Sequence, residues 1–353
     1  MFTDMLKRNK AVVGFDLGND YAQISYCRAD QSMPDTMSLV MGEEQYNIPT
    51  VLCRRRGNDT ADMWSVGKEA LKDASEKAGV LVEDLVLLAK NNVSVKLEDE
   101  DFAADALLAV FIRKTLAILS IYVKSEDIEA IAFTMRDMNA QLMEAVKKAV
   151  ETAGLKNTRL YFLSHEDCFF QYMIHQPQEM WIHDVLLYDY RSDGIKSYLL
   201  QMNRKTNPVA CFIETSMFPE KSAFYRQLDA ELLEIAKEQC GANNITSVFL
   251  LGDYFSREWC KEALRYLCRE RRVFQGNNLF SKGACYGARE KVYASTLSAS
   301  YVYLTDEKLR ANIGITCDRG QEEIYFPILD AGTNWYDAKR EFDVMLTKNN
   351  TFI

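Results

Sequence analysis

The sequence predicts an α/β protein built on a duplicated plan. Strand-like apolar runs alternate with helix-like segments along most of the 353 residues. A strand–turn–strand pattern with an acidic residue beside the turn occurs twice, at Asp16 and at Asp189. Each copy is followed further along the chain by strand–helix units. These three observations predict two related halves, each with its own sheet and helices.

The first half opens with β-structure. AVVGFDLG (11–18), YAQISYCRA (21–29) and YNIPTVLCRRR (46–56) read as short strands separated by turns. MWSVGKEALKDASEKAG (63–79) reads as the end of a strand running into a polar helix. Residues 101–123 have helical apolar spacing and no internal glycine or proline, which predicts one long, buried helix.

The clearest strand–helix unit lies in the middle of the chain. Residues 128–135 predict a strand, and the helix after it has two candidate N-caps, Asp137 and Asn139. Gly154 is well placed to end that helix as the C′ glycine. A further strand (155–164) and helix (165–176) follow.

The second half repeats the alternation. VLLYDY and KSYLLQM predict two strands joined in a hairpin. A strand, a helix, a strand and two further helices follow it, and the last fifty residues read as successive strands separated by turns. In order, the five predicted elements after the hairpin are 209–217, 224–241, 247–253, 256–272 and 281–295.

Composition narrows the classes of function. The net charge of −9 argues against general binding of nucleic acid or anionic membranes, since both depend on attraction to phosphate. Nine cysteines without CxxC spacing are typical of reduced thiols in a cytosolic protein. The N-terminus does not read as a signal peptide, and no apolar stretch is long enough to span a membrane. We therefore expect a cytoplasmic protein.

Several motifs follow one another in an informative order. VVGFDLGNDYAQIS and VLLYDYRSDGIKSYLL resemble the first and second phosphate loops of the actin-like ATPase superfamily, nearest to the DnaK-type heat-shock chaperones. Between them, AIAFTMRDMNAQLMEAVKKAVETAGL resembles the connecting segment of that family. SVFLLGDYFSREW is similar to its adenosine motif, and NNLFSKGACYGA to the helix after it. The resemblance covers most of residues 11–290.

The resemblance implies a bilobed actin-like ATPase fold, the duplicated ribonuclease H-like kind. Lobe I would cover about residues 1–183 and lobe II about 184–300. Only 63 residues separate Asp189 from Gly252, roughly half the chaperone spacing, so the second lobe is expected to be reduced. Residues 301–353 are similar to the opening strands of the chaperone's β-sandwich substrate domain.

The resemblance also implies a site for ATP or ADP with Mg²⁺. Catalytic positions would be Asp16, Glu166 and Asp189, with Asp16 and Asp189 acting on the metal through its water shell. Lys90 is the candidate for the lysine near the γ-phosphate, although its spacing from Gly67 differs from the family's by a few residues. The nucleotide-binding positions would be Gly18, Asn19, Asp20, Ser192, Gly194, Gly252 and Asp253.

The departures from the family pattern bear on that site. Three glycines of the second phosphate loop are replaced by Arg191, Ser192 and Asp193, whose side chains obstruct the approach of phosphate to the backbone. Lys196 stands where the family has its second metal-supporting aspartate. In the first loop, Asp20 replaces a hydroxyl and would repel phosphate if it points inward. Because lost electrostatic contacts each reduce the rate greatly, little hydrolysis is expected.

We therefore expect a DnaK-like protein with a degraded ATP site, a non-catalytic protein-binding or scaffolding module with an unknown protein partner or client. Weak nucleotide binding and no cofactor at all both stay open. The alternatives are an active ATP-hydrolysing chaperone and an actin-like cytoskeletal or cell-division protein. A nucleophile pair of Cys168 and His165 is a weaker interpretation than core packing of the cysteine. A metal site near His165 is a weaker interpretation than histidines on a helix face and at loop ends, because no strong metal spacing occurs.

Overall fold

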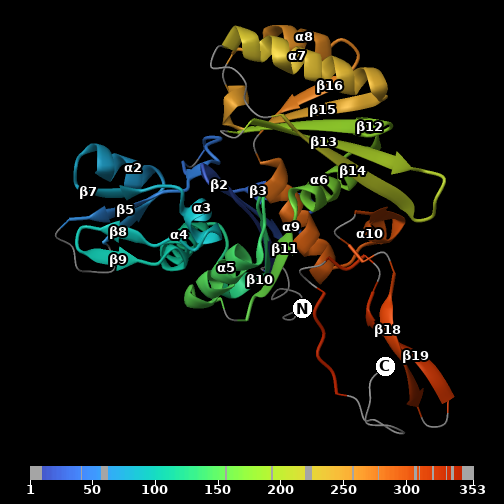
Figure 1. The fold of residues 1–353 in the computed structure, drawn as a ribbon, viewed down its shortest axis with the longest axis horizontal. Helices are drawn as coiled ribbons and strands as arrows, with labels where there is room; N and C mark the ends of the chain where they lie inside the picture. The colour runs from blue at the N-terminus through green and yellow to red at the C-terminus, as the bar shows by residue number, and fades with distance from the viewer. Residues whose placement is uncertain are drawn as a thin grey trace. The chain divides into compact units, whose positions relative to one another are not determined.

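The chain folds as two compact units, Met1–Val302 and Tyr303–Ile353 (Figure 1). The first unit combines two large sheets with helices, and this mixed architecture confirms the predicted α/β class. Among the described residues, no helix has the length and apolar character needed to cross a membrane. The computed structural model describes residues 10–40, 42–56, 63–155, 157–191, 194–218, 225–256, 258–276, 278–305, 308–309, 311–319, 322–330, 332–334 and 338–343.

Sheet I contains the first predicted hairpin. Its strand order is β11-β10-β1-β2-β3, and β4 also pairs with β2. The central strand β1 is parallel to β10 and antiparallel to β2, and all seven of its residues are buried. The strands are β1 (Ala11–Leu17), β2 (Tyr21–Arg28), β3 (Asp35–Thr36), β4 (Ile48–Pro49), β10 (Ile128–Thr134) and β11 (Arg159–Leu163).

Sheet II contains the second predicted hairpin. Its strand order is β16-β15-β12-β13-β14, with the short β17 at the far edge. The central strand β12 is parallel to β15 and antiparallel to β13. The strands are β12 (Asp184–Arg191), β13 (Gly194–Asn203), β14 (Val209–Phe218), β15 (Ile245–Leu251), β16 (Arg272–Gln275) and β17 (Tyr301–Tyr303).

The two sheets share one topology. In each, a hairpin supplies the first two strands, a third strand pairs antiparallel at one side, and two later strands add in parallel at the other side. β1 corresponds to β12, and β10 corresponds to β15. The parallel pairing of β1 with β10 and that of β12 with β15 both shift register after the first residue. The predicted duplication of a hairpin followed by strand–helix units is therefore present in the structure.

Helices cover the sheets and lie between them. α6 and α9 lie between the two sheets, where α9 packs on β1, β2 and β10 (Figure 1). A Cβ on Gly283 of α9 would lie 2.1 Å from the carbonyl oxygen of Cys168 in α6, so only glycine permits this close crossing. These helices are α4 (Ala104–Leu119), α5 (Ala140–Thr152), α6 (His165–Ile174), α7 (Tyr225–Ala242), α8 (Lys261–Leu267), α9 (Leu279–Val292) and α10 (Thr296–Ser300).

Local capping follows the sequence closely. Of the two candidate N-caps of α5, the structure selects Asn139, whose side chain accepts a hydrogen bond from the Leu142 N–H at 2.8 Å. Gly154 follows that helix with φ +84°, as expected of a C′ glycine. Ser164 and Asp167 form a reciprocal capping box at the start of α6.

The predicted helix 101–123 is too long at both ends. Helix α4 begins at Ala104 because Phe102 lies in a small hairpin, where its ring packs edge-on against Trp64 at 5.4 Å. The smaller elements of this region are α2 (Lys68–Ser75), α3 (Leu85–Lys90), the sheet of β5 (Leu52–Arg55), β6 (Trp64–Val66) and β7 (Gly79–Val82), and the hairpin of β8 (Val95–Leu97) and β9 (Glu100–Phe102).

The predicted helix 256–272 is also too long. Trp259 is buried, and its ring centroid lies 5.6 Å from that of Tyr190. The residues directly before α8 therefore pack into the core and do not extend that helix. The last predicted helical residue, Arg272, instead begins β16. The described residues of the unit also include the 3-10 helices η1 (Ser125–Asp127), η2 (Gln178–Met180) and η3 (Asp253–Ser256).

The second unit contains an antiparallel hairpin of β18 (Ile313–Arg319) and β19 (Glu322–Leu329). Ile313, Tyr325 and Phe326 on it are exposed, and Phe326 contacts Phe342 at 6.1 Å between ring centroids. The described part of this unit thus presents apolar side chains that the hairpin itself does not bury.

Candidate functional site

The two hairpins place Asp16 and Asp189 at equivalent positions. Each is the sixth residue of its strand, β1 and β12. Across the hairpins, Asp16 pairs with Gln23 and Asp189 pairs with Lys196. Both carboxylates are buried, Asp16 at 1% exposure and Asp189 at 0%. Buried carboxylates require partners that compensate for lost hydration.

Arg191 supplies that partner for both aspartates. Its Nε lies 3.1 and 2.9 Å from the two carboxylate oxygens of Asp189. Its Nη2 lies 3.6 Å from Oδ2 of Asp16, on the other sheet. One guanidinium therefore links the two equivalent carboxylates, which come from segments more than 170 residues apart.

The backbone of the first hairpin makes room for this guanidinium. A Cβ on Gly18 would lie 2.8 Å from Nη1 of Arg191 and 2.5 Å from the Tyr21 carbonyl oxygen. The guanidinium also lies over the Tyr21 ring, 5.5 Å from its centroid. In hairpin register Gly18 corresponds to Arg191, so the first turn lacks a side chain where the second turn carries a cation.

The charge states follow from these contacts. Burial by itself raises the pKa of the Asp16 carboxyl, but His165 and Arg191 outweigh it and hold that pKa below its ordinary value of 3.8. Burial opposes the charged form of Arg191, but Asp189, Tyr21 and Asp16 outweigh it and raise its pKa. Asp16 and Arg191 are thus both charged at neutral pH.

Glu166, the third predicted catalytic carboxylate, also has an internal cation. It lies in the first turn of α6, and its Oε1 is 3.0 Å from Nζ of Lys196 on β13. The ammonium of Lys196 also lies 5.0 Å from the Tyr198 ring centroid. Each of the three predicted catalytic carboxylates therefore meets a cation supplied by the hairpin of sheet II.

His165 also belongs to this network. The sequence had placed this histidine only on a helix face. Its Nε2 lies 3.1 Å from Oδ1 of Asp16, and its ring stacks on Phe280 at 3.8 Å. The histidine is fully buried. Its position directly after the N-cap of α6 was visible in the sequence, but its proximity to Asp16 depends on the packing of α6 against sheet I. Cys168 is buried and its pKa is well above the ordinary value, as expected for a core thiol.

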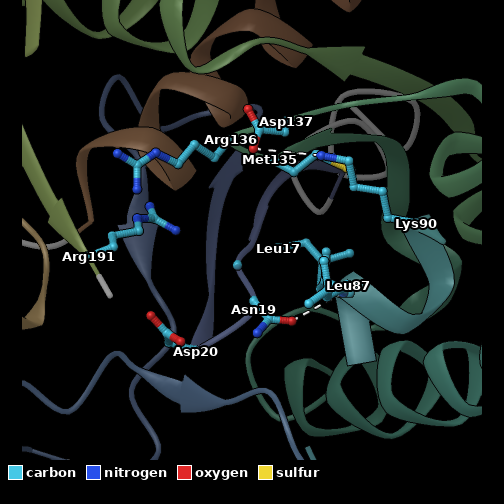
Figure 2. Close-up of a pocket in the computed structure, with 11 residues that line it drawn as sticks. Leu17, Asn19, Asp20, Leu87, Lys90, Met135, Arg136, Asp137 and Arg191 are labelled. Carbon is cyan, nitrogen blue, oxygen red and sulfur yellow. Dashed lines mark hydrogen bonds and ion pairs between the residues drawn. The ribbon is translucent and has the colours of Figure 1, made fainter. Parts of the chain in front are cut away.

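The first hairpin turn borders a pocket of about 240 Å³ (Figure 2). The pocket is lined by Gly18, Asn19 and Asp20, the residues that the resemblance assigns to the first phosphate loop. Asn19 is held against α3, since it donates to Asp84 Oδ1 at 2.6 Å and accepts from the Leu87 N–H at 3.2 Å. The volume lies below the roughly 300 Å³ at which pockets for drug-sized ligands begin, so the pocket is small for a nucleoside triphosphate.

Lys90 reaches the same pocket. Figure 2 shows it across the pocket from Arg136 and Arg191. Its Nζ lies 3.7 Å from Asp137, and its carbonyl oxygen accepts a hydrogen bond from Asn139 at 3.2 Å. The structure therefore brings Lys90 to the turn residues 18–20, although its spacing in the sequence departs from the family pattern.

The remaining predicted nucleotide residues lie elsewhere or outside the description. Gly252 has φ +98°, and a Cβ on it would lie 2.0 Å from the Tyr190 carbonyl oxygen, so packing against β12 requires glycine there. Asp253 opens η3, but its side chain lies outside the described residues, as does all of Ser192. Gly194 begins β13 with φ +112°.

Comparisons with known proteins match the chain to families but assign it no activity. A model described as "Family of unknown function (DUF5716) C-terminal" matches residues 33–306. A second, described as "Domain of unknown function (DUF8552)", matches residues 308–353. No curated protein matches the chain.

Proposed function

The chain belongs to the DUF5716 family, and for this member we propose a non-catalytic, DnaK-like module of the actin-like ATPase superfamily that binds or scaffolds other proteins. Two sheets of one topology, with an aspartate at the same place in each, support the proposed fold. The single observation that carries the loss of catalysis is the guanidinium of Arg191 paired with both Asp16 and Asp189.

The residues present do not fit a magnesium ion between those aspartates. Mg²⁺ needs carboxylates free to hold its water shell in near-octahedral geometry. Here Asp189 accepts from Arg191 through both oxygens, and Asp16 is shared between Arg191 and His165. A second positive charge beside this guanidinium would be repelled, since unit charges a few ångströms apart interact strongly at low dielectric.

The pairing of Glu166 with Lys196 also argues against catalysis. A carboxylate that positions an attacking water must accept hydrogen bonds from it. In this chain Lys196 holds Glu166 at 3.0 Å, with both side chains only about a fifth exposed or less. No hydrolytic step is therefore proposed at Asp16, Asp189 and Glu166.

The protein-binding part of the proposal draws on the second unit. Its hairpin exposes Ile313, Tyr325 and Phe326, and this exposed apolar surface supports a contact with another protein. The net charge of −9 disfavours nucleic acid as the partner.

The test combines binding, turnover and partner retention in the full chain. We expect no saturable heat on titration with Mg-ATP, no phosphate release above buffer, and no release of co-purified partner proteins by a Mg-ATP wash. As a sensitised control, the Arg191→Gly/Lys196→Asp variant should acquire a rise in Tm with MgCl₂ that the unaltered chain lacks. Micromolar affinity of the unaltered chain for Mg-ATP, with phosphate release abolished by Asp16→Asn, would overturn the proposal.

A further inference from the structure

We propose that Arg191 and Lys196 form an internal clamp that holds two lobes of the first unit, one built on sheet I and one on sheet II, closed without any ligand. Both residues project from the hairpin of sheet II, and both reach carboxylates of the other half: Asp16 on β1 and Glu166 at the start of α6. This inference goes beyond the proposed function, because it concerns the position of the lobes and not nucleotide chemistry.

The first arm of the clamp is anchored before it crosses between the sheets. Arg191 is held within its own sheet by both oxygens of Asp189, so its guanidinium is fixed in direction. The remaining face of the group meets Asp16 and the backbone at Gly18. A planar guanidinium suits this double role because its donors diverge from a rigid frame.

The second arm lies five residues further along the chain. Lys196 stands opposite Asp189 in the hairpin register, and Arg191 stands opposite Gly194, so the two cations lie on the same face of the hairpin, two residues apart in register. Its ammonium meets Glu166 at 3.0 Å. Opening the lobes would therefore separate two ion pairs together, one of them among almost fully buried groups.

Burial makes separation of the first pair costly. Asp16 and Arg191 are 1% and 8% exposed, and separating the two sheets would remove from each buried group the opposite charge that it faces on the other sheet. The pair of helices α6 and α9 joins the two sheets at a second place, because α9 packs on sheet I while Phe169 and Phe280 contact Tyr198 of sheet II at 6.4 and 5.8 Å between ring centroids. The hairpin end is therefore the side that the clamp controls. The closed arrangement is thus built from side chains of this chain.

The experiment measures the distance between the lobes directly. Spin labels are placed at exposed Glu144→Cys on α5 and Glu234→Cys on α7, with Cys268→Ser and Cys317→Ser removing accessible native thiols. Double electron–electron resonance should give one narrow distance distribution that Mg-ATP leaves unchanged. In Arg191→Met and in Lys196→Met the single peak should be lost, by broadening or a shift to longer distance.

Matched controls keep the test decisive. Lys148→Met removes a lysine paired with Asp105 at 3.8 Å within one lobe, and should leave the distribution unchanged. If Arg191→Met fails to fold, Lys196→Met carries the test, since its pair is partly solvent-exposed. A folded Lys196→Met/Arg191→Lys variant that keeps the narrow peak would overturn the clamp. Hydrolysis of ATP by an unchanged, closed protein would instead count only against the proposed function.

Discussion

The two hairpins of the first unit are alike in backbone and opposite in the chemistry of their turns. In the hairpin of sheet I, Gly18 carries no side chain, and the guanidinium of Arg191 packs closely against it. At the corresponding position in sheet II, Arg191 supplies that guanidinium, which pairs with Asp16 and Asp189. The comparison teaches that two sheets of one topology can complete a site with their own side chains, because one hairpin supplies the glycine and the other the cation.

The largest effect should come from removing the cation. Arg191→Met removes the guanidinium that two buried carboxylates share, which should lower the free energy of unfolding by about 3–5 kcal/mol. Urea denaturation of the full chain measures it. Arg54→Met, which breaks a pair with the exposed Glu100, should cost far less. Equal losses in the two variants would show that the cluster has no special energetic role.

A smaller effect should come from adding a side chain at Gly18. Gly18→Ala puts a methyl group 2.5 Å from the Tyr21 carbonyl oxygen and 2.8 Å from Nη1 of Arg191. Overpacking of this kind costs about 1–3 kcal/mol, measured by thermal unfolding. Gly241→Ala in α7, where a Cβ meets nothing within 4 Å, is the matched control and should not destabilise. Tolerance of both substitutions would contradict the proposed fit between turn and guanidinium.

The smallest effect concerns pH. Because the pKa of Asp16 is lower in the folded chain than its ordinary 3.8, this carboxylate stabilises the fold above that pH. That stabilisation should be lost as the pH falls through the folded-state pKa, at a slope of at most about 1.4 kcal/mol per pH unit. Asp16→Asn should flatten this part of the acid unfolding profile. An unchanged profile in the variant would rule out Asp16 as a contributor.

Much of the fold could be read from local patterns. The strand–turn–strand patterns at residues 11–29 and 185–202 predicted both hairpins, and the polar side chains of Asp137 and Asn139 indicated where α5 starts. The errors fell where tertiary contacts override helical spacing. Phe102 joins a hairpin against Trp64, and Trp259 packs into the core ahead of α8.

The site could be predicted in part. Asp16, Asp189 and the obstruction by Arg191 were all evident from the hairpin motifs. The role of Arg191 as a shared partner was not, because a sequence states which side chain occupies a turn but not which distant carboxylate it meets. His165 illustrates the same limit, since its contact with Asp16 spans 149 residues.

The sequence by itself determined the alternating strands and helices, the two equivalent aspartates, and the presence of side chains in place of glycine at residues 191–193 beside the second one. These depend on side-chain periodicity and on backbone freedom within a few residues. Only the tertiary structure decided that Arg191 and Lys196 neutralise Asp16, Asp189 and Glu166. Ion pairs between separate segments depend on distance and burial, and folding sets both.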